Sequence, residues 1–104
     1  MNRIGYSYRF DRDIDLREVK STLLLALLAA EGLFGRSRVR MDTAWAGDET
    51  INVIVIDAGT LVGMTVSLIF TTFLRAEFGL RAFDVRQVDM LPDGLRMGPL
   101  DTRS

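Results

Sequence analysis

The chain has 104 residues, 48% of them hydrophobic and 26% charged, with a net charge of -1, and this length accommodates one domain with one core. So small a charge gives no field that favours nucleic acid or an anionic membrane as a partner. Cysteine and histidine are both absent, which excludes disulfides, thiolate metal sites, cysteine nucleophiles and the usual general base, so the sequence favours binding over catalysis and predicts no cofactor or metal.

A strand is predicted over residues 4–10. Apolar and aromatic side chains alternate with small or charged ones, and one face of this segment carries Ile4, Tyr6, Tyr8 and Phe10. A period of two is typical of a half-buried strand. The segment has no apolar stretch of the kind found in signal peptides, and we therefore expect a cytoplasmic protein.

A helix is expected to begin after Asp15. The side chain of Asp15 can cap the helix, and Glu18, three residues later, completes a capping box. Apolar residues then recur at helical spacing as far as Gly32 or Gly35. Either glycine can end the helix.

The next two strands are predicted to form a hairpin. In "RSRVRMDTAWA", Val39, Met41, Thr43 and Trp45 alternate with Arg38, Arg40, Asp42 and Ala44. This alternation predicts a strand with one buried face. Gly47 and Asp48 favour a turn after it. Residues 51–56, "INVIVI", are apolar on both faces, as expected of a central strand.

A second helix is predicted from about Thr60 to Phe78, with Gly79 ending it. The stretch from Ala58 to Leu74 has no charged residue, and its length is near the lower limit of roughly 17 residues for a membrane span. Four threonines inside it and the glycine after the helix favour a helix within a globular unit. We therefore do not expect a membrane as a partner.

A last strand is predicted in "RAFDVRQVD", where Phe83 and Val85 oppose Asp84 and Arg86. The element order is strand, helix, strand, strand, helix, strand. The two halves also share Ala-Glu, a nearby glycine and a Val-Arg pair at matching places. The sequence therefore predicts an α+β ferredoxin-like βαββαβ plait, with a four-stranded antiparallel sheet in the order 4-1-3-2 and two helices on one face. We expect a single domain over 1–89 and a flexible tail over 90–104.

The segment "VIVIDAGT" resembles the phosphate-binding turn of sugar kinases and other actin-like ATPases, which implies a nucleotide site. In those proteins the turn joins two strands of a much longer two-domain chain, whereas a helix is expected here. We interpret Asp57 or Thr60 as the helix cap and Gly59 as the residue that turns the chain. The alternative is a small-molecule or anion site at Asp57, Gly59 and Thr60, with Asp57 as the acid of a carboxylate-based enzyme.

The uncovered face of the expected sheet is a second candidate site. The predicted phase places Ser7, Arg9, Arg38, Arg40, Asp42, Asn52, Ile54, Ile56, Asp84 and Arg86 on it. Arginines can hold phosphates, but RNA-binding sheets also expose aromatic residues, which here point toward the helices. A charged rim around Ile54 and Ile56 favours protein docking over nucleic acid or an ordinary solvated face.

Both predicted helices are apolar over more of their surface than one sheet requires. Leu25 on the first helix, and Leu61, Met64 and Leu68 on the second, fall outside the expected core stripes. A monomer would expose these residues as an apolar patch, which soluble proteins rarely tolerate. We therefore expect a homo-oligomer, a dimer or higher, and a non-catalytic self-associating binding module.

Two further patterns are a pair of matched glutamates and a short motif in the tail. Glu31 and Glu77 hold matching places near the two helix ends and could share a metal or a proton, although two solvated side chains fit the pattern better. In the tail, "LRMGPL" (Leu95–Leu100) resembles the short peptides that load cargo into encapsulin shells, which implies a protein partner. Met97 and Pro99 depart from the usual residues of those peptides.

Overall fold

A four-stranded antiparallel sheet with helices against it forms the framework. The computed structural model describes residues 3–90. In chain order the elements are β1 (Arg3–Phe10), α1 (Leu16–Phe34), α2 (Arg36–Asp42), β2 (Trp45–Asp48), β3 (Val53–Asp57), α3 (Leu61–Phe78), the 3-10 turn η1 (Leu80–Ala82) and β4 (Phe83–Met90). The fold class is therefore α+β, as predicted.

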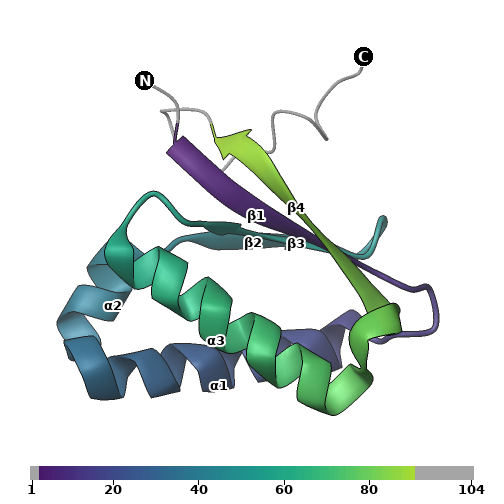
Figure 1. The fold of residues 1–104 in the computed structure, drawn as a ribbon, viewed down its shortest axis with the longest axis horizontal. Helices are drawn as coiled ribbons and strands as arrows, with labels where there is room; N and C mark the ends of the chain where they lie inside the picture. The colour runs from purple at the N-terminus through teal and green to yellow at the C-terminus, as the bar shows by residue number, and fades with distance from the viewer. Residues whose placement is uncertain (1–2, 91–104) are drawn as a thin grey trace.

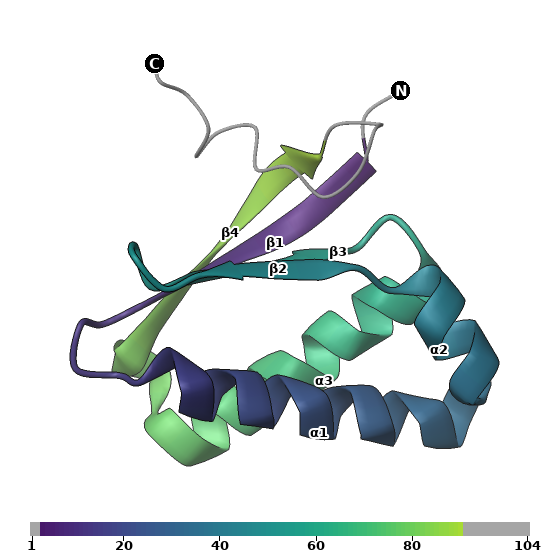
Figure 2. The same cartoon turned by 180° about the vertical axis from the view of Figure 1, so that it is seen from behind.

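The sheet order is β2-β3-β1-β4, which reads 4-1-3-2 from the other edge. The central strand β1 pairs with β3 and β4, so that Tyr8 stands opposite Ile54 on one side and Val85 on the other. The helices all lie on one face of the sheet, with α1 and α3 side by side and α2 at one end (Figures 1 and 2). The opposite face has no helix among the described residues.

The boundaries of the two long helices follow their capping residues. The Asp15 carboxylate accepts a hydrogen bond from the Arg17 N–H at 2.9 Å, and α1 ends at Gly35, whose φ is 87°. The Thr60 hydroxyl accepts a hydrogen bond from the Gly63 N–H at 2.9 Å, and α3 ends at Gly79, whose φ is 89°. Positive φ suits glycine at helix ends because it has no Cβ.

The prediction of a strand over "RSRVRMDTAWA" is wrong for its first seven residues. These residues form α2, a third helix where two were expected, and the strand begins only at Trp45. Val39 is buried, but Met41, which the strand pattern would bury beside it, is 82% exposed. The Arg38 guanidinium lies 5.2 Å from the centre of the Phe34 ring and 3.5 Å from the Asp42 carboxylate. The ion pair between Arg38 and Asp42, four residues apart, stabilises a helix and not a strand.

The phase predicted for β3 is also wrong. Ile54 and Ile56 are 0% and 1% exposed and belong to the core beneath the helices. Val53 and Val55 occupy the opposite face instead. A strand that is apolar on both faces carries no alternation from which its phase can be read, and the pairing with Tyr8 decides it in the structure.

Tyr8 stands at the centre of the core. Its ring is fully buried and meets Phe70 edge to face, with the ring centres 4.9 Å apart. Its hydroxyl donates to the Ser67 carbonyl at 3.1 Å and lies 2.9 Å from the Thr71 hydroxyl. Burial raises the pKa of Tyr8, so the phenol stays protonated in neutral solution.

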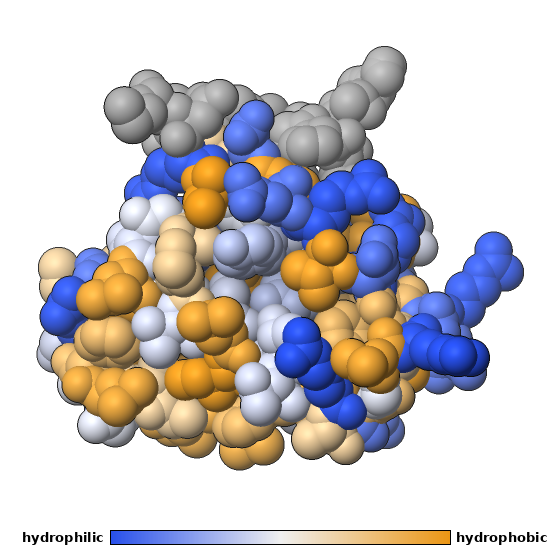
Figure 3. Space-filling model, viewed as in Figure 1, coloured by the Kyte–Doolittle hydropathy of each residue, from blue (hydrophilic) through white to orange (hydrophobic). Residues whose placement is uncertain are grey.

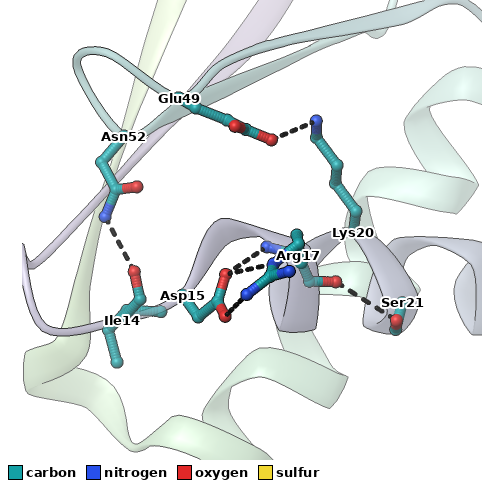
Figure 4. A network of polar contacts seen from close by, with 7 residues as sticks. All are labelled: Ile14, Asp15, Arg17, Lys20, Ser21, Glu49 and Asn52. Atoms are coloured by element: carbon teal, nitrogen blue, oxygen red, sulfur yellow. Dashed lines mark hydrogen bonds and ion pairs between the residues drawn. The ribbon is translucent and has the colours of Figure 1, made fainter.

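A polar network joins the start of α1 to the turn between β2 and β3 (Figure 4). Asn52 has a φ of 56°, and its side-chain amide donates to the carbonyls of Asp11 at 2.7 Å and Ile14 at 3.1 Å. Lys20 forms an ion pair with Glu49 at 3.2 Å. These contacts hold the β1–α1 loop against the hairpin and so fix where α1 crosses the sheet.

Candidate interaction surface

Exposed apolar side chains gather on the outer side of α1 and α3. Leu25 and Leu28 on α1 are 57% and 60% exposed, and Leu61 and Leu68 on α3 are 63% and 64% exposed. Two neighbours extend the group, and the full set, called the helical patch below, is Leu24, Leu25, Leu28, Leu61, Met64 and Leu68.

Helical spacing aligns the exposed apolar residues of each helix. On α3, Leu61, Met64 and Leu68 follow one another at steps of three and four, which places them on one stripe. The Thr22 hydroxyl donates to the Glu77 carboxylate, so the start of α1 lies beside the end of α3. The two helices are therefore antiparallel (Figure 1), and Leu25 and Leu28, which follow Thr22 on α1, lie beside the second half of α3.

The patch has a polar border. Figure 3 shows hydrophobic residues gathered over the helices in the lower part of the view and hydrophilic residues concentrated around the upper part. At the opposite end of the two helices, the exposed positions are occupied by Arg17 and Ser21 on α1 and by Thr72 and Arg75 on α3. An apolar centre with a polar rim is the usual anatomy of a protein–protein interface.

A groove of about 340 Å³ adjoins the patch between α1 and α2. Its walls are mostly apolar, and its lining residues are Leu24, Leu27, Leu28, Glu31, Val39, Arg40 and Thr43. Leu24 and Leu28 belong to both the groove and the helical patch. The surface is therefore not flat, and it offers a depression that a side chain from another molecule can fill.

The Asp57–Thr60 turn uses its polar groups internally. The Asp57 carboxylate accepts the Gly59 N–H at 2.8 Å and forms an ion pair with Arg3 at 3.0 Å. The Thr60 hydroxyl caps α3 and also donates to the Asp42 carbonyl at 2.6 Å. These contacts fit the interpretation of Asp57 and Thr60 as capping and turn residues. The anion site at this turn stays a prediction.

Close packing leaves little space at this turn. A side chain at Gly63 would overlap the carbonyl oxygen of Asp57, and one at Gly59 would come within 2.6 Å of the Arg3 side chain. The backbone of α3 therefore approaches the end of β3 as closely as a glycine permits.

The residues predicted to form an interface on the sheet are dispersed. Ile54 and Ile56 are in the core, and Arg38 and Arg40 lie on α2, so none of the four is on the uncovered face. Arg9 and Arg86 are exposed, and their register partners Val53 and Ser7 place them on the face without helices, as predicted. Two of the four arginines expected on this face are therefore present there.

The two matched glutamates do not form a pair. Glu77 accepts a hydrogen bond from Thr22, which precedes Glu31 by nine residues on α1. Nine helical residues span about 13 Å along the axis. Glu31 instead lines the α1–α2 groove. Within residues 3–90, no group of three acidic residues is placed to hold a metal ion.

The sequence interpretation missed part of the surface. Leu25, Leu61, Met64 and Leu68 are exposed as predicted, but Leu24, Leu28, Leu33 and Met41 were not singled out. For Leu24 and Leu28 the signal was present in "LLLALLAA", where the core needs only two positions in each turn. Met41 was missed because its segment was assigned to a strand.

Comparison with family models, curated proteins and solved structures finds no significant match for this chain. One described helix, α3, is long and apolar enough to cross a membrane by length and composition, and about a third of it is buried within the fold. The motif "LRMGPL" and the predicted tail from residue 91 onward lie outside the described residues, whereas Met90 is the last residue of β4. The functional interpretation therefore depends on the surfaces of residues 3–90.

Proposed function

We propose that this chain is a cytoplasmic, non-catalytic binding module that self-associates through the helical patch. In this proposal the fold is a ferredoxin-like plait to which α2 has been added. The observation that carries it is the set of exposed apolar side chains on α1 and α3, in which five leucines are more than half exposed. Exposed patches of this kind mark interaction sites in soluble proteins.

The expected strength of the interface follows from the exposed area. Burying a whole leucine side chain contributes about 2 kcal/mol, so six partly exposed side chains contribute on the order of 5 kcal/mol per subunit. Association costs about 4 to 15 kcal/mol in lost freedom of motion. We therefore expect a reversible, concentration-dependent dimer in which the α1–α2 groove adds contacts from the second copy.

The alternative of a ligand site at the Asp57–Thr60 turn has weaker support. The carboxylate of Asp57 and the hydroxyl of Thr60 each already bond two groups of the same chain. A ligand would have to displace those contacts, whereas the helical patch is available without rearrangement.

The test compares charge substitutions inside and outside the patch. We expect the unmodified chain to show a monomer–dimer equilibrium in sedimentation velocity between about 5 and 500 µM. The double variant Leu25→Glu and Leu68→Glu should be monomeric throughout, because two pairs of charges would be buried unpaired. Both leucines are exposed, so the melting temperature should change little.

The matched control is the double variant Ser21→Glu and Thr72→Glu, which places two charges on the polar end of the same helices. It should dimerise like the unmodified chain. A monomer at every concentration for the unmodified chain, or a dimer that survives Leu25→Glu and Leu68→Glu, would contradict the proposal.

A further inference from the structure

A second apolar cluster lies on the sheet face that is turned away from the helices. Val53 and Val55 of β3 and Val88 and Met90 of β4 are each 3% exposed or less. Side chains alternate between the faces of a strand, so these four point away from the core that holds Ile54. The helices among residues 3–90 all lie on the other face (Figures 1 and 2), and none of them covers this cluster.

Strand β1 separates the two sides of the cluster, and this strip of the sheet face is called the furrow below. On this face β1 presents two small residues: Gly5, whose partners are Asp57 and Val88, and Ser7, whose partners are Val55 and Arg86. The Met90 side chain lies directly above Gly5. A Cβ added at Gly5 would be only 2.6 Å from the Met90 sulfur. Ser7 therefore leaves the lowest point of the furrow, beside Val55, which suits an apolar side chain of an extended segment.

The rim of the furrow is charged. Arg9 and Arg86 are exposed on the same face, and the ion pair between Arg3 and Asp57 lies at the end where β1 begins. A narrow apolar furrow between charged side chains offers little area to a second sheet, which would need a flat face. A single strand-like segment fits it better.

We propose that residues 91–104 of the same chain pack along this furrow. The segment starts at the furrow itself, because Met90 is both the last residue of β4 and part of the cluster. Its 14 residues (104 − 90) reach up to roughly 46 Å when extended. The five residues of β1 from Gly5 to Arg9 span about 17 Å, so the segment is more than long enough.

The composition of the segment agrees with this occupant. Leu91, Leu95, Met97 and Leu100 supply apolar side chains, and Pro92 and Pro99 favour extended backbone. In this arrangement "LRMGPL" is held by its own domain, and a partner protein that binds it must displace it from the furrow. The sheet face is then a self-covered surface, distinct from the helical patch.

The experiment uses the full chain and its lack of cysteine. The variant Arg96→Cys carries a single thiol, to which a nitroxide spin label can be attached, and amide signals near the label broaden in NMR spectra. We expect the amides of Ser7, Val55 and Val88 to lose most of their intensity, and those of α1 to keep it. Diluting the labelled protein with excess unlabelled, unmodified chain should leave the broadening unchanged.

Each other outcome overturns the proposal. No broadening on β1 and β3 means that the segment does not reach the furrow. Broadening that disappears on dilution means that the segment of a second copy occupies it. The spin-labelled triple variant Leu95→Ser, Met97→Ser and Leu100→Ser should lose the broadening, and the control Leu80→Ser, an exposed leucine elsewhere, should keep it. Unchanged broadening in the triple variant also contradicts apolar docking.

Discussion

Tyr8 illustrates how one residue links the sheet to the helices. It comes from the central strand, fills the space beneath Phe70, and places its hydroxyl between the Ser67 carbonyl and the Thr71 hydroxyl of α3. A buried phenol with its hydroxyl bonded stabilises the fold, whereas a buried phenolate would carry an uncompensated charge. The protonation of this residue therefore affects the stability of the whole domain.

The pH dependence of stability follows from Tyr8. Burial raises the pKa of Tyr8 above its ordinary value of 10.0, so the unfolded chain releases this proton at lower pH than the folded one. The contribution of Tyr8 to the free energy of unfolding is fully present below pH 10, and it falls as the pH rises above this value. We expect the urea midpoint to drop above pH 10, and the drop to be smaller in Tyr8→Phe. An equal drop in both proteins would contradict this role.

The packing of α3 on β3 depends on a single close contact between two elements. Gly63 faces the carbonyl oxygen of Asp57 with no room for a side chain, whereas Gly32 on α1 has open space around it. The two glycines therefore serve different purposes. Gly63 permits an approach of two backbones, while Gly32 only weakens its helix.

Substituting these glycines by alanine should give opposite results. Gly63→Ala should destabilise the domain by about 1 to 3 kcal/mol, because α3 must shift away from β3. Gly32→Ala should stabilise it by about 0.5 to 1 kcal/mol through helix propensity. Urea denaturation of the two variants measures both effects. If Gly63→Ala were as stable as the unmodified chain, the close approach would not constrain the packing.

Sequence patterns predicted the elements that carry their own end signals. Asp15 and Thr60 begin the long helices, and Gly35 and Gly79 end them, because capping and positive φ are properties of a few neighbouring residues. The class of the fold, its strand pairing and the exposed leucines of α3 followed from these boundaries and from helical spacing.

The features that could not be predicted depend on contacts distant in sequence. Residues 36–42 alternate like a strand, and only the docking of Val39 against α1 and the core selects a helix for so short a segment. The phase of β3 depends on which of its two apolar faces meets Tyr8. Ile54 and Ile56 were assigned to the surface for that reason.

At the scale of the whole molecule, the two faces of the sheet differ in chemistry. The helices cover one face and present the uncharged helical patch to solvent, while the other face carries Arg9 and Arg86 around an apolar furrow. The effect of salt on self-association tells which of the two surfaces forms the contact. Salt screens charged contacts, whereas it strengthens apolar contacts slightly.

We expect self-association to be nearly independent of salt. The net charge is -1 and the proposed interface is uncharged, so the dissociation constant should change less than about threefold between roughly 50 and 500 mM NaCl. Calorimetry should show a negative heat-capacity change on association. A dissociation constant that rises tenfold or more over the same range would assign the contact to the arginines of the sheet face.

The register of the outer ladder has a practical consequence. Arg3 and Met90 are partners across β1 and β4, which places their Cα atoms only about 5 Å apart. A short peptide bridge can therefore join the two, and the chain can be reopened in the exposed bend at Glu49 and Thr50. Such a circularly permuted form would retain every strand pairing, and its new ends would lie in the turn between β2 and β3.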